Sequence, residues 1–159
     1  MFLRIPKPFV LRVRITYELS GNMQDLDVND STWTVIVYQS MSGDAEVGSG
    51  SFQMVGGKLI SENGGLFYTT NTTSHILLSG VEIEKSADSE YLLACLGNTN
   101  SRGWGSKGKN GADCTFTAVG QSLDGAVLWD SVSNLEFYLT QNSVLCGAVM
   151  QDESYAGEG

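Results

Sequence analysis

The sequence predicts an all-β protein built as a right-handed parallel β-helix, a solenoid with three short strands in each coil of about 20–23 residues. Three observations predict this class. Charged residues make up only 17% of the chain, and the abundance of Gly, Ser, Thr and Asn favours strands joined by tight turns over helices. Apolar and polar residues alternate in short runs that end at turn residues. The same order of three runs recurs along the chain.

The first run of each repeat has the clearest alternation. Examples are 51–55, 114–118 and 135–139. Turn residues follow these runs, at Gly57, Gly80, Gly120 and Asn142. The first and the last interval between successive turns match one coil, whereas the middle interval, from Gly80 to Gly120, is nearly twice as long. The long interval therefore corresponds either to two coils or to one coil that carries a long insertion.

Two further runs follow each turn at similar offsets. The second runs are 59–60, 81–83, 123 and 144–145, and the third runs are 66–68, 91–93, 127–129 and 148–150. In a β-helix each strand pairs with its counterpart in the next coil, with apolar side chains inside and polar ones outside. An antiparallel sandwich is the structural alternative, because it also uses short, regularly spaced strands. The recurrence at about 22 residues and the absence of a clear hairpin turn favour the β-helix.

The repeat divides the chain into three parts. Residues 1–33 are irregular and form a cap or a first coil, and residues 34–150 form the coils. Within the coils, residues 97–111 are Gly-rich and basic and are expected to protrude as a loop. Residues 151–159 form an acidic, Gly-rich tail that we expect to be flexible and not to cap the last coil. Open strand edges would then remain, so we expect a longer natural chain or molecules that pack end to end.

Charge and composition exclude several classes of function. The net charge of −9 disfavours nucleic acid, whose affinity depends on Lys and Arg. No run approaches the ~20 apolar residues of a membrane helix, and the N-terminal segment, from Met1 to Tyr17, lacks a signal-peptide core. His75 is the only histidine and no Cys-x-x-Cys motif occurs, which argues against zinc. Cys95, Cys114 and Cys146 are expected to be buried free thiols, with one disulfide as the alternative.

An ordered succession of motifs resembles a known family. The motifs are YQSMSGDA at 38–45, GSGSFQMVGG at 48–57, ENG at 62–64, LFY at 66–68, TNT at 70–72, SRGWG at 101–105 and LDGAVLWDSVSNL at 123–135. From Thr34 to Met150 the chain is similar to large secreted right-handed β-helix proteins of gut Firmicutes, which are uncharacterised or called adhesin-like. The resemblance implies the β-helix fold and an extracellular or cell-surface location. It implies no catalytic residue.

The glycine-rich insertion holds the residues that we expect to bind a ligand. Trp104 lies between two glycines, so its indole could lie flat against a sugar ring. Arg102, Lys107 and Lys109 supply donors for hydroxyl or carboxylate groups. The alternative is that Trp104 packs back against the side of the solenoid.

Enzymatic readings rest on acidic residues along the strands. A β-helix lyase or hydrolase needs clustered carboxylates with a nearby cation, and the candidates are Asp124, Asp130, Glu82 and Glu84. No Lys or Arg is expected to align with them, so they are interpreted as solvated outward positions.

The Thr-rich segment 69–73 suggests an ice-binding array, but the pattern does not recur on the next coil.

Together these observations predict a non-catalytic extracellular or cell-surface module. It would act as a scaffold or adhesin and bind carbohydrate, such as a host or cell-surface glycan. No cofactor is expected, with calcium kept as an alternative. The other functional hypothesis is a polysaccharide lyase or glycoside hydrolase of the β-helix type.

Overall fold

A computed structural model of the chain describes residues 10–13, 33–39, 48–62, 64–87, 89–98 and 109–154. These residues form fourteen strands and no helix. Within them there is accordingly no helix long and apolar enough to cross a lipid bilayer. Every pairing between the described strands is parallel, so the antiparallel sandwich is wrong.

The strands belong to four sheets. Sheet A consists of β1 (Val10–Val13), β4 (Lys58–Ser61) and β7 (Glu82–Lys85), and sheet D of β10 (Ser122–Asp124) and β13 (Val144–Cys146). Sheet B consists of β2 (Trp33–Tyr38), β5 (Gly65–Thr70), β8 (Tyr91–Cys95), β11 (Ala126–Trp129) and β14 (Val149–Gln151). Sheet C consists of β3 (Ser49–Val55), β6 (Thr73–Ser79), β9 (Asp113–Val119) and β12 (Asn134–Thr140).

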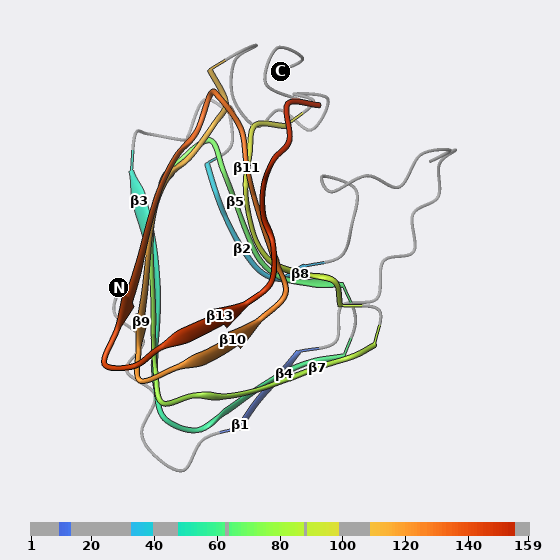
Figure 1. The fold of residues 1–159 in the computed structure, drawn as a ribbon. Helices are drawn as coiled ribbons and strands as arrows, with labels where there is room; N and C mark the ends of the chain where they lie inside the picture. The colour runs from blue at the N-terminus through green and yellow to red at the C-terminus, as the bar shows by residue number, and fades with distance from the viewer. Residues whose placement is uncertain are drawn as a thin grey trace.

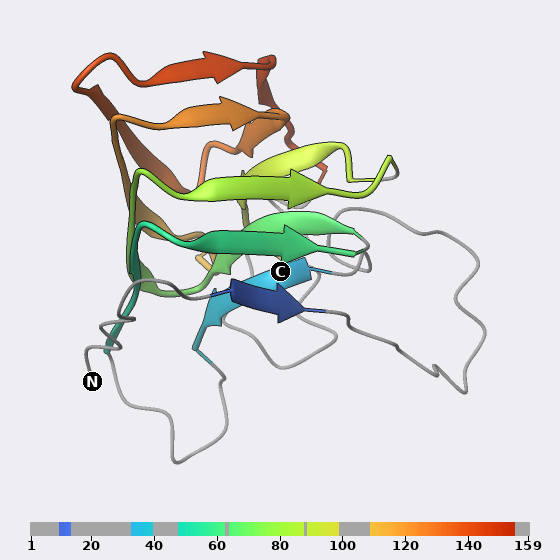
Figure 2. The ribbon, with the colours of Figure 1, turned by 90° about the horizontal axis from the view of Figure 1, so that it is seen from below.

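The chain visits these sheets in a fixed order. It passes from sheet A or D to sheet B, then to sheet C, and returns one level further along the stack (Figure 1). Seen from the side, equivalent strands lie above one another from the N-terminal to the C-terminal end (Figure 2). This arrangement is compatible with a parallel β-helix. The three recurring runs of the sequence coincide with the strands of sheet C, of sheets A and D, and of sheet B.

Turns after the sheet C strands require a left-handed backbone. Gly57, Gly80 and Gly120 have φ values of 83°, 58° and 56°, which glycine adopts without a steric penalty. In the last coil, Gln141 and Asn142 take φ values of 52° and 63° at the equivalent place. These recurring turns connect sheet C to sheet A or D, and their spacing allowed the repeat to be recognised in the sequence.

The long interval between Gly80 and Gly120 is one coil with an insertion. Thr73 of β6 lies opposite Asp113 of β9, and the two strands stay in register to their last pair, Ser79 and Val119. This unbroken pairing leaves no room for another strand between them. The extra residues therefore fall between β8 and β9, where the glycine-rich insertion was expected.

The main core lies between the three sheet faces. It contains inward side chains from each of them, such as Leu59 and Leu123, Phe67 and Val127, and Met54 and Phe116. Within sheet C the Phe116 ring stacks on Phe137 of the next coil, with centroids 4.6 Å apart and an interplanar angle of 2°. Such columns of equivalent side chains bury apolar surface between coils, which a single coil cannot do alone.

Sheet B departs from the expected pattern of polar outward positions. All six residues of β5 are buried, and its outer face contributes Tyr68 to a second apolar cluster with Ala94 and Leu128. Trp33 of β2 belongs to this cluster, and its ring stacks on Tyr68 with centroids 5.4 Å apart. Runs of consecutive apolar residues are typical of strands buried on both faces. The alternation rule therefore holds for sheet C but not for sheet B.

Candidate functional site

Among the described strands, the face formed by sheets A and D parts between β7 of sheet A and β10 of sheet D. Here the side chain of Gln121 joins the two coils. Its Oε1 accepts a hydrogen bond from the Val81 amide at 2.8 Å, and its Nε2 donates to the Val81 carbonyl at 2.6 Å. Gln121 is almost fully buried, so its amide satisfies backbone groups that would otherwise be left unpaired.

A groove of about 550 Å³ opens beside this interruption. Its lining is Val81, Glu82, Ile83, Lys85, Ser86, Ala87, Ser89, Ser122 and Asp124. Lys85 ties the two sides together, because its Nζ lies 3.5 Å from Asp124 Oδ2 and donates to the Ser89 carbonyl at 3.1 Å. Gly125, with φ of 122°, makes room for this ammonium, since a Cβ there would lie 2.8 Å from Nζ. The groove is therefore lined by apolar side chains together with the Lys85–Asp124 pair, and the buried Ser86 hydroxyl in its lining has no hydrogen-bond partner among the described residues.

A second lysine pairs with the acidic residues of β7. Lys58 Nζ lies 3.0 Å from Glu82 Oε1 and 2.6 Å from Glu84 Oε2, and these hydrogen bonds to Glu84 and Glu82 raise the lysine pKa. The expectation that no cation aligns with these carboxylates is wrong, because Lys58 stands opposite Glu82 in the β4–β7 register. Both glutamates are exposed outward positions, as expected. Among the described residues no three His, Cys, Asp or Glu side chains are placed to hold a metal ion.

Sheet C carries a second hollow on its outward face. The hollow has a volume of about 440 Å³ and is lined by Thr73, Asp113, Cys114, Thr115, Asn134, Leu135 and Glu136. Asn134 Nδ2 donates to Asp113 Oδ1 at 2.6 Å across the two strands. The Tyr138 hydroxyl donates to Glu136 Oε2 at 3.1 Å, and this bond raises the tyrosine pKa. Acceptors, donors and an exposed ring thus share one strand face.

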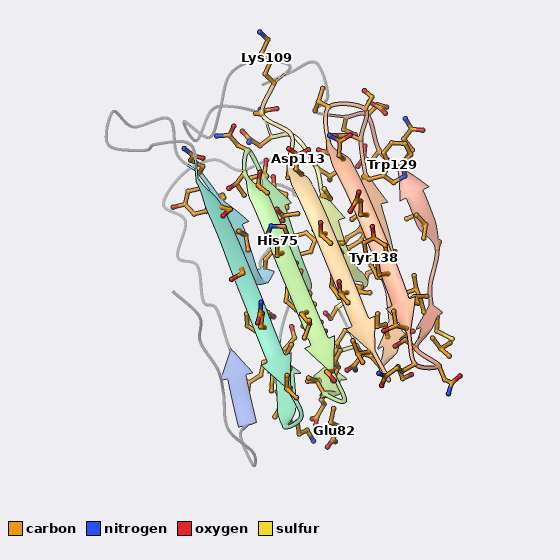
Figure 3. The ribbon with its side chains drawn as sticks, turned by 90° about the vertical axis from the view of Figure 1, so that its left-hand side faces the viewer. His75, Glu82, Lys109, Asp113, Trp129 and Tyr138 are labelled. Carbon is orange, nitrogen blue, oxygen red and sulfur yellow. The ribbon has the colours of Figure 1, made fainter. Side chains whose placement is uncertain are left out.

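The outward face of sheet C around this hollow, which we call the polar ladder, is polar near the hollow, whereas the far end of the same face also contains Leu77, Val55 and Val119. Outward residues occupy equivalent positions on β3, β6, β9 and β12, and Figure 3 shows His75, Asp113 and Tyr138 along this face. One column contains Ser51, His75, Thr115 and Glu136. Neighbouring strands are about 4.8 Å apart, so the face presents polar groups at a regular repeat.

The corner at the base of the insertion holds a buried polar cluster. Asp130 is fully buried, which contradicts its interpretation as a solvated outward residue. Its Oδ2 accepts from the Gly97 amide at 2.6 Å, whereas its Oδ1 has no partner among the described residues. Burial raises the pKa of Asp130. Asn110 donates to the Asn98 carbonyl at 2.5 Å, and its own Oδ1 also lacks a partner in the part of the chain that the structure describes.

Threonines of the Thr-rich segment are also buried. Thr69 and Thr70 are completely buried within β5. Thr69 donates to Ser74 at 2.8 Å, and Thr70 donates to the Asn110 carbonyl at 3.0 Å. Buried hydroxyls cannot form a flat outer array, so the ice-binding reading of this segment is wrong.

The residues predicted to bind a ligand fall mostly outside the described parts of the chain. Trp104, Arg102 and Lys107 lie there, so their predicted roles stay predictions. Lys109 is exposed and lies at one end of the sheet C face, beyond Asp113 (Figure 3). The sequence did not single out Asp113, although an acidic residue opening an alternating strand was a usable signal.

The three cysteines are free thiols. Cys95 and Cys114 are buried, as expected, but Cys146 is exposed. Contact with the Cys114 thiol, reinforced by burial, raises the pKa of Cys95. The Cys95 thiol is therefore protonated at neutral pH and forms part of the packing at the insertion corner.

Comparison of the chain with family models, with curated proteins and with solved structures finds no match. The resemblance to secreted β-helix proteins of gut Firmicutes therefore stays a prediction.

Proposed function

We propose that the chain is a right-handed parallel β-helix module of an extracellular or cell-surface protein, and that it acts as a non-catalytic scaffold or adhesin that binds glycans. The all-parallel pairing and the fixed order of sheets support the solenoid. The resemblance of residues 34–150 to secreted β-helix proteins supports the location. In this proposal the glycan lies on the outward face of sheet C.

The observation that carries the proposal is the hollow within the polar ladder of sheet C. Asp113, Asn134 and Glu136 offer planar polar groups for sugar hydroxyls, and the exposed ring of Tyr138 suits the apolar face of a sugar. Strands at regular spacing would present a polar side chain to each successive unit of a polymer, although its chemical type differs from strand to strand. Lys109, at the end of this face, would add a cation for acidic sugars.

The enzymatic alternative also has a specific observation in its favour. Asp113 and Glu136 line the same hollow, and glycoside hydrolases use a pair of carboxylates on either side of the scissile bond. Each carboxylate already accepts a hydrogen bond from a neighbouring side chain. No lysine or arginine lines the hollow, so a lyase-type base is not supplied by the described residues.

A glycan array followed by titration calorimetry tests the proposal. We expect binding of at least one glycan class, with no new reducing ends and no unsaturated product on prolonged incubation. Turnover of a bound glycan would overturn the non-catalytic assignment. Failure to bind any glycan on the array would overturn carbohydrate as the ligand.

Matched variants locate the site. Glu136→Gln removes an exposed carboxylate from the hollow and should weaken binding about tenfold, as expected for a hydrogen bond to a charged group. Glu84→Gln removes an exposed carboxylate from the other side of the molecule and should leave binding unchanged. Equal effects of the two variants would place the glycan away from sheet C.

A further inference from the structure

Two cysteines that are distant in the chain meet at one corner of the stack. Cys95 ends β8 of sheet B and Cys114 lies near the start of β9 of sheet C, with the insertion between them in the sequence. Their side chains are 0% and 2% exposed, and both belong to the main core. The two thiols therefore lie on the inward faces of neighbouring sheets, beside the base of the insertion.

This corner is held in register with the preceding coil. The Leu96 amide, next to Cys95, donates to the Thr69 carbonyl at 3.2 Å. Cys95 of β8 pairs with Thr69 of β5. Cys114 of β9 pairs with Ser74 of β6. The two cysteines thus hold the same pair of positions that a threonine and a serine hold one coil earlier.

The preceding coil shows how close side chains at these two positions come. The Thr69 hydroxyl donates a hydrogen bond to the Ser74 hydroxyl oxygen at 2.8 Å. Cysteine carries its sulfur where serine and threonine carry this oxygen, so the same positions bring two sulfurs together. In the coil of the insertion, the Cys95 thiol accordingly donates a hydrogen bond to the Cys114 sulfur. Such contact is compatible with the β-carbon separation of about 3.8 Å that a disulfide needs.

The two thiols differ in how readily they lose a proton. The hydrogen bond from Cys95 lowers the pKa of Cys114, against the effect of burial, and a hydrogen bond with Ser74 lowers it further. Contact with Cys114 and burial raise the pKa of Cys95. A thiolate rather than a thiol attacks a disulfide, so Cys114 is the expected nucleophile.

We propose that Cys95 and Cys114 form an intramolecular disulfide in an oxidising thiol–disulfide pool, and that this bond closes the corner from which the insertion leaves the stack. With glutathione disulfide as the oxidant, the Cys114 sulfur attacks one of its sulfurs and the S–S bond breaks. The departing glutathione takes the proton that Cys114 gives up. The Cys95 sulfur then attacks Cys114 in the mixed disulfide, and the second glutathione leaves with the Cys95 proton. Two protein thiols and one glutathione disulfide thus become one protein disulfide and two molecules of reduced glutathione.

The bond would tie sheet B to sheet C covalently within one coil. It closes a loop from residue 95 to residue 114, which restricts the unfolded chain and should stabilise the folded one. Its formation depends on the redox poise of the surroundings and not on glycan binding. Both sulfurs are buried, so the thiols react while the chain folds or when the corner opens.

Thiol counting after refolding tests the proposal. Cys146→Ser removes the exposed thiol, which would otherwise form adducts. The full chain with this substitution is refolded from urea in a buffer of reduced and oxidised glutathione, alkylated in denaturant and analysed by mass spectrometry. We expect a chain that has lost two hydrogen atoms and carries neither alkyl groups nor glutathione. Its urea midpoint should fall when dithiothreitol is added.

The same buffer with urea kept throughout is the control for the fold. The folded chain should raise the ratio of disulfide to dithiol at least about tenfold over the unfolded one, because the corner holds the sulfurs together. Two alkylated thiols after refolding, persistent glutathione adducts, or an equal ratio in urea would each overturn the proposal.

Exchanging side chains between the two coils tests whether the corner is the cause. Cys95→Thr with Cys114→Ser inserts the side chains of the preceding coil and should abolish the response to glutathione. Adding Thr69→Cys and Ser74→Cys should restore a disulfide one coil earlier. Circular dichroism reports whether each variant folds. A folded exchange variant whose two thiols stay reduced would overturn the corner geometry as the cause.

Discussion

On one side of the molecule, the four strands of sheet C pair over seven residues each without interruption. On another of the three faces, sheets A and D part between β7 and β10, and the Gln121 side chain joins them. The coil that contains this break also carries the long insertion. A continuous ladder on one side thus tolerates an irregular coil on the other, because one buried amide satisfies the backbone groups that the missing pair would have used.

The largest expected effect is on the continuous side. Phe116→Ala removes a fully buried ring from the aromatic column and should lower the free energy of unfolding by about 3–5 kcal/mol. Phe137→Ala is the matched control in the last coil. The Phe137 ring is only half-buried, so this substitution should lower the free energy of unfolding by clearly less. Urea denaturation followed by circular dichroism measures both. Equal losses would mean that the last coil is as well packed as the interior.

Breaking the contact of Gln121 with Val81 should have the next largest effect. Gln121→Ala leaves the amide and carbonyl of Val81 unpaired beside a buried site, which costs about 2–4 kcal/mol for two such groups. Gln53→Ala changes an exposed glutamine on β3 and should change stability by less than about 0.5 kcal/mol. Hydrogen exchange adds a local readout, because the Val81 amide should lose protection. If that amide stays protected in Gln121→Ala, Gln121 does not hold the two sheets together.

Replacing the buried carboxylate should stabilise the insertion corner. Asp130→Asn keeps an acceptor for Gly97 and removes a charge that burial disfavours, so we expect a gain of about 1–2 kcal/mol at neutral pH. Because burial raises the pKa of the folded state, the folded wild type binds the proton more tightly than the unfolded chain. Its stability should therefore fall as pH rises from the unfolded value, ~3.9, through the raised folded one.

The variant provides the pH control for this prediction. Melting temperatures measured across this range should decline for the wild type and decline less for Asp130→Asn. If the melting temperatures of the wild type and of Asp130→Asn fall equally with pH, Asp130 has the same pKa in the folded and unfolded states.

The smallest expected effect belongs to the ion pair across the groove. Asp124 is exposed and Lys85 retains its hydrogen bond to Ser89 without it. Asp124→Asn should therefore change stability by only about 0–1 kcal/mol, with the difference vanishing at high salt. Denaturation at low and high salt measures it. A large loss of stability that does not depend on salt would mean that this ion pair, rather than Gln121, holds sheets A and D together.

The strand order was predictable because two signals repeat independently. Turns at Gly57, Gly80 and Gly120 need a left-handed backbone, and the alternation before each turn marks the strand of sheet C. The ion pair of Lys58 and Glu82 was missed, although the two residues hold the same place in successive coils of the observed register. Counting from strand to strand rather than from turn to turn would have aligned them.

Other features left no signal in a single sequence. Gln121 is one glutamine among several polar turn residues, and its role depends on the tertiary gap that it fills. Asp130 follows a strand of sheet B, where the outer face is covered, so alternation could not tell that it is buried. The candidate hollow combines residues of β9 and β12 that lie about one coil apart, such as Asp113 and Asn134. It becomes visible only once the register is known.

The join at Gln121 has a mechanical consequence. Sheets C and B resist extension along the stack through backbone hydrogen bonds between successive coils, whereas the face formed by sheets A and D is held between β7 and β10 by the Gln121 side chain and the Lys85 ion pair. A load along the stack should therefore open the face of sheets A and D first and bend the molecule toward sheets B and C, which stay paired. In single-molecule pulling we expect a short, reversible extension before unfolding, and Gln121→Ala should abolish it. A protein tethered between two surfaces would thereby yield elastically under shear before any coil is lost.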